Sequence, residues 1–181
     1  GEVLTKLAAD NGIEIVSVPG ACAAISALTV SAIDASRFTF QGFLPRDKTR
    51  SERISEVVRS ELTSVLYESP HHLSRTLSEL AQLIPNRSIS VCKELTKLHE
   101  SVWRGNISDA AAHFSEGAQG EYVLVIAGAE SADADELTDE AILNLLRNCI
   151  KRGMSRKDAV KDVTARTGEP RNRIYSLSSK L

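Results

Sequence analysis

The chain has 181 residues, a formal net charge of -2 and 42% hydrophobic residues, few of them aromatic. This length and composition allow one aliphatic core and a small additional unit. No stretch approaches the roughly 18 uninterrupted apolar residues that a membrane span requires, and no basic, apolar leader stands at the start. We therefore expect neither a membrane protein nor a secreted one.

Helical and extended patterns alternate over the first 128 residues. The helical patterns cover residues 2–10, 21–33, 50–62, 71–84 and 108–115. The extended patterns cover residues 13–18, 37–44, 63–68, 88–95, 100–107 and 121–128, and several are nearly continuous runs of Val, Ile and Leu. This alternation predicts an α/β fold: a layered domain with a mixed, largely covered sheet.

A change in composition follows this predicted domain. Residues 129–140 are mostly acidic or small, which is typical of a linker. Three helical patterns come next, without an extended one: residues 138–152, a second that begins after Ser155 and closes at Gly168, and a third that opens with Pro170. Ser155 can cap the second helix, with Asp158 in a variant capping box. We expect a small three-helix C-terminal appendage that resembles a helix-turn-helix arrangement.

The three cysteines, Cys22, Cys92 and Cys149, lie far apart in apolar surroundings. Their odd number and spacing suit neither a disulfide framework nor a zinc site. We expect small buried hydrophobic residues in a reducing compartment.

The charge is divided unevenly along the chain. Residues 151–181 hold nine Lys/Arg and three Asp/Glu, a balance of +6, which leaves 13 basic and 21 acidic residues in positions 1–150. Such a division is typical of a protein with one end that binds a polyanion. The alternative is a small helical domain with solvated charges, or a dimer contact.

A Pro19-Gly20 turn separates a predicted strand from a predicted helix. In open α/β sheets, ligands bind at such strand ends. The free N–H groups of a first helical turn can bind polar ligand atoms, and the following residues are small enough for close approach: Ala21, Cys22 and Ala23. An ordinary strand-to-helix turn is the alternative.

The segment FQGFLPRDKTRSER combines turn residues with four cations: Arg46, Lys48, Arg50 and Arg53. Lys and Arg in a loop suit contact with RNA or phosphate. A solvated helix N-terminus is the alternative, although cations are unfavourable at that end of a helix.

Two further clusters follow predicted strands. In YESPHH, Tyr67, Glu68 and Ser69 are expected to project from a strand end into a cleft. In KELTKLHE, Glu94 and Lys97 can place a proton acceptor and a cation near a reacting hydroxyl. A surface salt-bridge patch is the alternative for this second cluster.

Several common catalytic motifs are absent from the sequence. It contains no P-loop, G-x-S-x-G, H-E-x-x-H or C-x-x-C. The commonest nucleotide-hydrolysis, esterase, protease and zinc classes are therefore excluded.

Five segments in this order resemble the tetrapyrrole-methylase superfamily: PGACAAISAL, FQGFLP, YESPH, KELTK and GEYVLVIAG. Within that superfamily the chain is similar to the bacterial ribosomal RNA small-subunit methyltransferase I group, over nearly its whole length. The resemblance implies S-adenosylmethionine as cofactor and methyl transfer to the ribose 2′-hydroxyl of a cytidine in 16S ribosomal RNA. It also implies the small ribosomal subunit as partner, a cytoplasmic location and a homodimer.

The resemblance implies cofactor contacts at nine positions, and the basic segments supply the expected RNA contacts. The cofactor positions are Pro19, Gly20, Cys22, Ala23, Tyr67, Glu68, Leu95, Tyr122 and Val123. The expected RNA contacts are Arg46, Lys48, Arg50 and Arg53 in the loop and Arg156, Lys157, Arg171 and Arg173 in the tail. Glu94 and Lys97 are the candidate catalytic pair.

Three domains are expected by this resemblance. They are a remnant of an N-terminal cofactor-binding domain (residues 1–33), a second α/β methylase domain (34–129), and a linker with a basic helical RNA-binding appendage (130–181). The family's earlier motifs are missing, so we expect this chain to be a truncated, inactive portion that binds the cofactor weakly.

One residue departs from the family pattern, and two other functions remain open. The family's usual Arg after YESPH is His72 here, which would be a weaker and pH-dependent phosphate ligand. The alternative functions are a methyltransferase acting on a corrinoid or related tetrapyrrole, and a non-catalytic RNA-binding module.

Overall fold

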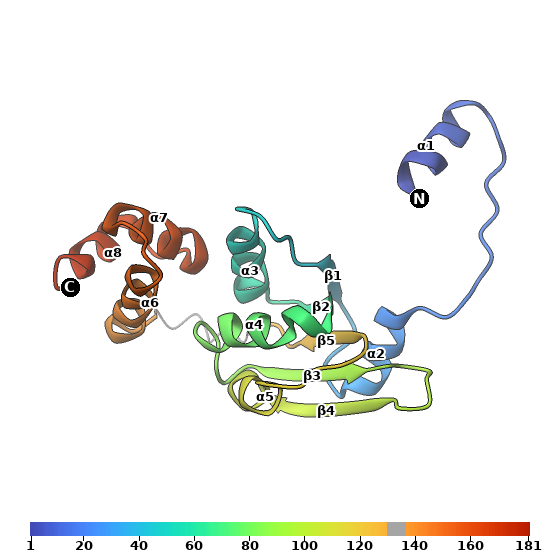
Figure 1. Cartoon of the computed structure of the whole chain (residues 1–181). Helices are drawn as coiled ribbons and strands as arrows, with labels where there is room; N and C mark the ends of the chain where they lie inside the picture. The colour runs from blue at the N-terminus through green and yellow to red at the C-terminus, as the bar shows by residue number, and fades with distance from the viewer. Residues whose placement is uncertain (130–136) are drawn as a thin grey trace.

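A five-stranded sheet lies at the centre of the molecule (Figure 1), and the computed structural model describes residues 1–129 and 137–181. The strand order is β1-β2-β5-β3-β4. The strands are β1 (Phe38–Phe43), β2 (Thr63–Glu68), β3 (Ser88–Lys93), β4 (Ser101–Asn106) and β5 (Tyr122–Ile126). β1 and β2 pair in parallel and the other pairs are antiparallel, so the predicted mixed sheet is confirmed.

The burial of each strand follows its residue pattern. β5, with the sequence YVLVI, is buried at every position, and β2 is buried at all positions but one. β1 at the sheet edge is buried at none of its positions, and Phe40 and Phe43 are exposed there. Apolar residues on both faces of β2 and β5 therefore require helices on both sides of the sheet.

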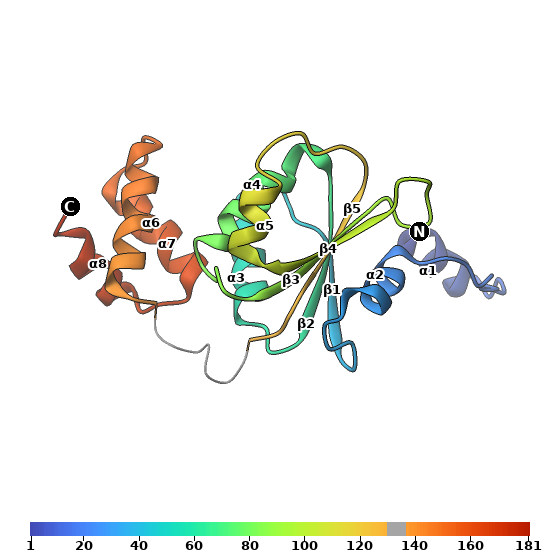
Figure 2. The same cartoon turned by 90° about the horizontal axis from the view of Figure 1, so that it is seen from below.

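Helices cover both faces of the sheet (Figure 2). On one face, α2 (Ala23–Ser31) packs Ala24, Ala27 and Leu28 against apolar side chains of β2, β3 and β5. Its small residues allow this close approach. On the other face lie α3 (Arg50–Arg59), α4 (Pro70–Ala81) and α5 (Ile107–His113).

The three C-terminal helices predicted from the sequence are present. They are α6 (Asp139–Lys151), α7 (Arg156–Thr167) and α8 (Arg171–Ser178). Ser155 caps α7, because its Oγ accepts from Asp158 N at 3.2 Å, and Gly168 ends that helix in the left-handed conformation. The predicted linker lies largely outside the described residues.

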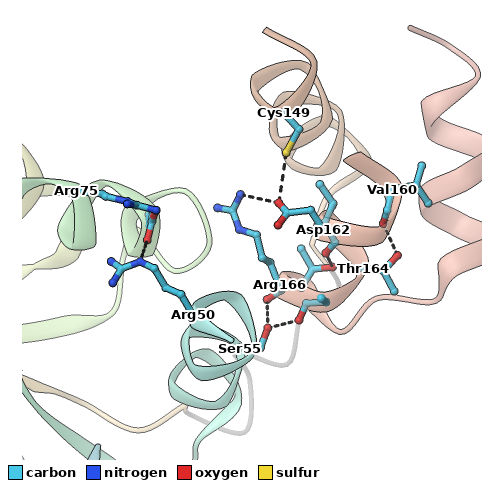
Figure 3. Close-up of polar contacts among 12 residues, drawn as sticks. Arg50, Ser55, Arg75, Cys149, Val160, Asp162, Thr164 and Arg166 are labelled. Atoms are coloured by element: carbon cyan, nitrogen blue, oxygen red, sulfur yellow. Dashed lines mark hydrogen bonds and ion pairs between the residues drawn. The ribbon is translucent and has the colours of Figure 1, made fainter. Parts of the chain in front are cut away.

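The C-terminal helices share a hydrophobic core with the α/β domain. One cluster of buried residues joins Ile54 and Val57 of α3 to side chains of α6, α7 and α8. Ser55 Oγ of α3 also donates to the carbonyl oxygens of Ala165 and Arg166 at the end of α7 (Figure 3). The appendage is therefore docked on α3.

The N-terminal residues differ in two ways from the sequence predictions. The predicted helix is present as α1 (Glu2–Asp10), but it buries no residue and lies away from the sheet (Figure 1). The predicted strand over residues 13–18 is wrong, because this segment pairs with no strand. Cys22 is exposed, unlike the buried Cys92 and Cys149, so the expectation of three buried cysteines is also wrong.

No helix within residues 1–129 and 137–181 is both long and apolar enough to cross a membrane.

Candidate functional site

A pocket of about 510 Å³ lies at one end of the central strands, where β2 ends and β5 begins. We call it the strand-end pocket. The register places Glu68 opposite Tyr122 and Lys93 opposite Tyr122, so the ends of β2 and β3 meet there. Its lining residues are Ala23, Phe43, Tyr67, Glu68, Ser69, Pro70, Glu121, Tyr122 and Val123. Its size is within the usual range of small-molecule sites.

Five of the nine residues predicted to contact the cofactor line this pocket: Ala23, Tyr67, Glu68, Tyr122 and Val123. Leu95 packs beside them against the apolar cluster under α2. The three remaining residues, Pro19, Gly20 and Cys22, lie exposed in the segment before α2, and the structure does not bring them into the pocket.

Tyr67 and Phe43 form an aromatic wall of the strand-end pocket. Their ring centroids are 5.6 Å apart in an edge-to-face arrangement, and Phe40 contacts Tyr67 in the same way at 5.0 Å. Such ring faces can hold a flat apolar ligand group. Phe43 was not among the predicted contacts, although it stands in the motif FQGFLP.

The carboxylate of Glu68 is buried and held in place. Its Oε1 accepts from Ser69 N at 2.9 Å, and its Oε2 accepts from Thr76 Oγ1 at 2.6 Å. These bonds tie the end of β2 to the start of α4, so Glu68 fixes the shape of this wall. Ser69 Oγ is itself buried, and it has no hydrogen-bond partner within the described residues.

Lys97 joins two carboxylates at the rim of the strand-end pocket. Its Nζ lies 2.9 Å from Glu94 Oε1 and 2.9 Å from Glu121 Oε2. Glu94 and Thr96 have positive φ angles of 50° and 67°, so the chain turns sharply after β3. The predicted catalytic pair therefore lies beside the pocket, because Glu121 lines it.

The charges of this cluster are mutually stabilised. The hydrogen bond from Lys97 and that from the backbone N–H of Glu121 lower the pKa of Glu94. The hydrogen bonds to Glu121 and Glu94 raise the pKa of Lys97. A carboxylate with a lowered pKa is a weaker base, so the pair is better suited to fix charge and geometry than to remove a proton.

The predicted RNA contacts have different environments. Arg46, Lys48 and Arg53 are exposed around the start of α3, where Arg53 pairs with Glu56 at 2.7 Å. Three of the four tail residues are exposed on α7 and α8: Arg156, Lys157 and Arg171.

Arg50 differs from the exposed cations because it is buried, and its predicted RNA contact stays a prediction. Its side chain is buried, and its guanidinium donates to Glu79 Oε2 at 2.9 Å and to Thr76 Oγ1 at 2.8 Å. Because Thr76 also binds Glu68, Arg50 belongs to a buried polar network that reaches the strand-end pocket.

Arg173 is committed to contacts within the C-terminal helices. It pairs with Asp139 at 2.9 Å and Glu169 at 2.8 Å and donates to the carbonyl of Leu137 at 2.7 Å. These bonds tie the start of α6 to α8. The prediction of an RNA contact at Arg173 missed this structural role.

An open mixed sheet between helical layers, with a pocket at its strand ends, defines an α/β fold with a candidate small-molecule site. A model of the family Tetrapyrrole (Corrin/Porphyrin) Methylases matches residues 1–111. The chain belongs to this family.

Curated relatives match the chain over nearly its whole length. Ribosomal RNA small subunit methyltransferase I of Synechocystis sp. is 37% identical over 184 residues, which cover 100% of this chain and 66% of that protein. The protein of the same name from Bacillus subtilis is 33% identical, with 97% of this chain and 62% of that protein covered. The chain thus spans somewhat less than two thirds of these relatives.

Solved structures share the fold at low sequence identity. The cobalamin biosynthetic enzyme cobalt precorrin-4 methyltransferase is 14% identical with a TM-score of 0.53, over 70% of this chain and 57% of that one. A conserved hypothetical protein from Aeropyrum pernix K1 is 13% identical with a TM-score of 0.52, over 99% of this chain and 65% of that one.

Proposed function

We propose that this protein is an S-adenosylmethionine-dependent methyltransferase that acts on a cytidine ribose 2′-hydroxyl of 16S ribosomal RNA. The observation that carries the proposal is the match to ribosomal RNA small subunit methyltransferase I of Synechocystis, which covers the whole chain, α6–α8 included. The described residues would form the second half of the cofactor site and an RNA-binding unit.

The strand-end pocket fits part of the cofactor. Ala23 is small, Val123 adds apolar surface, and Phe43 and Tyr67 offer ring faces. Ser69 Oγ offers a buried hydroxyl without a partner among the described residues. S-adenosylmethionine, when bound, supplies a methyl group on a positively charged sulfur. The pocket residues would orient that methyl group and exclude water. Correct orientation of the reacting groups lowers the barrier to such a transfer.

Glu94 and Lys97 remain the candidate residues near the reacting hydroxyl. The Lys97 ammonium, held between Glu94 and Glu121, would fix a positive charge at the rim. With its lowered pKa, Glu94 would orient Lys97 and accept a hydrogen bond from the ribose hydroxyl. If Glu94→Ala and Lys97→Ala both left turnover unchanged, this role would be contradicted.

We further propose the domain division at residues 33 and 129, a homodimer and a cytoplasmic location, where ribosomal RNA substrates are found.

The two alternative functions, a tetrapyrrole methyltransferase and a non-catalytic RNA-binding module, have less support. The solved cobalt precorrin-4 methyltransferase covers 70% of this chain, whereas the Synechocystis relative covers all of it, and both carry enzyme names. A tetrapyrrole substrate and a non-catalytic RNA-binding role are therefore not favoured.

A methyl-transfer assay tests the proposal. The N-terminal part of the Synechocystis relative that precedes the matched region would be joined to residue 1 of this chain. We expect this fusion protein to transfer tritium from methyl-labelled S-adenosylmethionine to small ribosomal subunits, with a reverse-transcription stop at one cytidine ribose. Label in a tetrapyrrole but not in RNA, or no label in either, would contradict the proposal.

A further inference from the structure

A second pocket, of about 280 Å³, lies between the α/β domain and the C-terminal helices (Figure 3). We call it the α3–α7 pocket. Its walls come from the start of α3, from α4, and from α6 and α7. It shares no lining residue with the strand-end pocket, so it is separate from the proposed cofactor site.

Arg166 presents a buried, unpartnered donor in this pocket. The residue is 7% exposed, and its Nη1 reaches Asp162 Oδ2 only at 3.5 Å, the limit of a hydrogen bond. Its Nη2 is buried and has no hydrogen-bond partner among residues 1–129 and 137–181. Because a buried guanidinium nitrogen without an acceptor is unfavourable, such a group indicates a site for an anionic partner.

The pocket carries an excess of positive charge. Five cations line it, against three carboxylates: Lys48, Arg50, Arg75, Arg152 and Arg166, against Asp47, Glu79 and Asp162. Glu79 is already bound by Arg50 and Arg75, each at 2.9 Å. Lys48 and Arg152 are exposed and form no ion pair with any described residue.

The first turn of α3 adds to this preference for anions. Arg50 and Ser51, the first two residues of the helix, line the pocket, and the N-cap residue Thr49 makes no side-chain hydrogen bond to the described helix end. Part of this end is already occupied, because Arg50 N donates to the carbonyl oxygen of Asp47 at 3.2 Å and Thr49 N donates to the Asp47 carboxylate at 2.9 Å. The N-terminus of a helix has free N–H groups and a partial positive charge, which favour phosphate. The helix end and the orphaned nitrogen of Arg166 are independent features that favour the same kind of ligand.

We propose that the α3–α7 pocket binds one phosphate group of an RNA strand, with Arg166 as the buried donor and Lys48 and Arg152 at the rim. A guanidinium N–H forms strong hydrogen bonds with phosphate oxygens, which fits the buried Nη2 of Arg166, since it has no partner among the described residues. RNA is favoured over a free anion because Lys48 belongs to the exposed basic loop with Arg46, so an extended strand can continue along the surface.

This inference rests on the proposed function for its choice of RNA. It adds a defined phosphate contact at the junction of the α/β domain and the C-terminal helices. A phosphate held there would bridge α3 and α7, and the appendage would bind RNA together with α3.

Two measurements on the 181-residue chain test the site. In a thermal-shift titration, inorganic phosphate should raise the Tm more than chloride at equal ionic strength. Arg166→Gln should abolish this excess shift, and Arg152→Ala should reduce it. Lys151→Ala removes the same charge from the neighbouring exposed position, outside the pocket, and should keep the full shift.

The second measurement is the affinity for a labelled fragment of 16S ribosomal RNA at several salt concentrations. Loss of one phosphate contact should lower the slope of log K against log[salt] by about 0.7–0.9 in Arg152→Ala and in Arg166→Gln. Lys151→Ala should bind with the slope of the unaltered chain. Arg152 is exposed, so its variant remains informative even if Arg166→Gln does not fold.

Three outcomes would overturn the inference. The first is that phosphate raises the Tm no more than chloride does, and the second is that phosphate raises the Tm equally in Arg152→Ala and Lys151→Ala. The third is that phosphate raises the Tm as expected, but Arg152→Ala and Arg166→Gln bind RNA as the unaltered chain does, which would indicate a site for a free anion. None of these depends on methyl transfer. Failure of the fusion protein to methylate RNA would contradict the proposed function and leave the phosphate measurements intact.

Discussion

Gly120 lies against the side chain of Glu94 in the candidate catalytic cluster, and it has no side chain of its own. Its φ is 87°, and a Cβ at this position would lie 2.7 Å from Cγ of Glu94. The backbone conformation therefore favours glycine, and a Cβ at this position would displace the side chain of Glu94. Glu94, which holds Lys97 at the rim of the strand-end pocket, occupies the space that a Cβ of residue 120 would take.

We predict that Gly120→Ala lowers the free energy of unfolding by more than the about 1–2 kcal/mol expected for a left-handed alanine alone. Gly117→Ala is the matched control, because Gly117 has a similar φ of 72° but a Cβ there would meet no described atom within 4 Å. Urea denaturation of both variants measures the difference. Equal losses would show that Glu94 moves away at no cost and that the contact is unimportant.

Glu79 gives a second prediction at this scale, on pH dependence. Burial opposes its ionisation, but hydrogen bonds from Arg75 and Arg50 and their charges outweigh this, and the pKa of Glu79 is lowered. A group with a lowered pKa in the folded state stabilises the fold above its unfolded pKa. That stability is lost as the pH falls through the folded value.

Glu79→Gln should therefore destabilise the chain at pH 7, by up to about 3 kcal/mol, because it leaves Arg50 buried without its charge partner. The difference from the unaltered chain should shrink as the pH falls below the ordinary range of a glutamate. Denaturation midpoints between pH 7 and pH 3 measure this. Glu56→Gln, in an exposed pair with Arg53, should cost about 0.5 kcal/mol or less at every pH; a matching pH profile in the two variants would contradict the assignment.

At the scale of elements, the contact between α3 and α7 decides whether the C-terminal helices act as a separate unit. Ser55 is 1% exposed, and its hydroxyl binds two carbonyl oxygens at the end of α7. A buried hydroxyl with such partners contributes about 1 kcal/mol, and leaving its acceptors unpaired costs more.

We predict that Ser55→Ala increases hydrogen exchange in α6, α7 and α8 and leaves β2 and β5 protected. Ser78→Ala, on the exposed face of α4, is the control and should change neither. Unchanged exchange in α7 would show that the apolar contacts alone dock the C-terminal helices.

The sequence patterns predicted most elements because local signals and tertiary packing agree in them. The apolar run at residues 63–68 is β2, and the capping residues Ser155 and Gly168 bound α7 as predicted. The segment 13–18 has a strand-like pattern as well, but a strand requires a neighbouring strand, and a local pattern contains no information on pairing.

The candidate site was predictable where it depends on strand ends. Tyr67, Glu68 and Tyr122 converge because the ends of neighbouring strands meet at one end of the sheet. The roles of Arg50 and Arg173 were missed because their partners lie far away in the sequence: Glu79 is 29 residues from Arg50, and Asp139 is 34 residues from Arg173. A cation in a basic segment cannot be assigned to RNA or to the fold without knowledge of such partners.

At the scale of the whole molecule, the surfaces of α1 and of the segment after it contrast with the packed remainder. Val3, Leu4 and Leu7 are more than half exposed, as are Ile13, Ile15, Val16 and Val18. The predicted cofactor contacts Pro19, Gly20 and Cys22 lie in the same segment. We propose that Pro19, Gly20 and Cys22 contact the cofactor in a part of its site that lies outside the strand-end pocket.

Isothermal titration of S-adenosylmethionine tests this account most directly. It would compare the 181-residue chain with the fusion protein that carries the preceding part of the Synechocystis relative. We predict micromolar binding to the fusion protein and at least tenfold weaker binding to the chain alone, a difference of about 1.4 kcal/mol or more. Equal affinity in both would contradict a cofactor site shared between two domains, and the absence of binding in both would contradict the assignment of the cofactor.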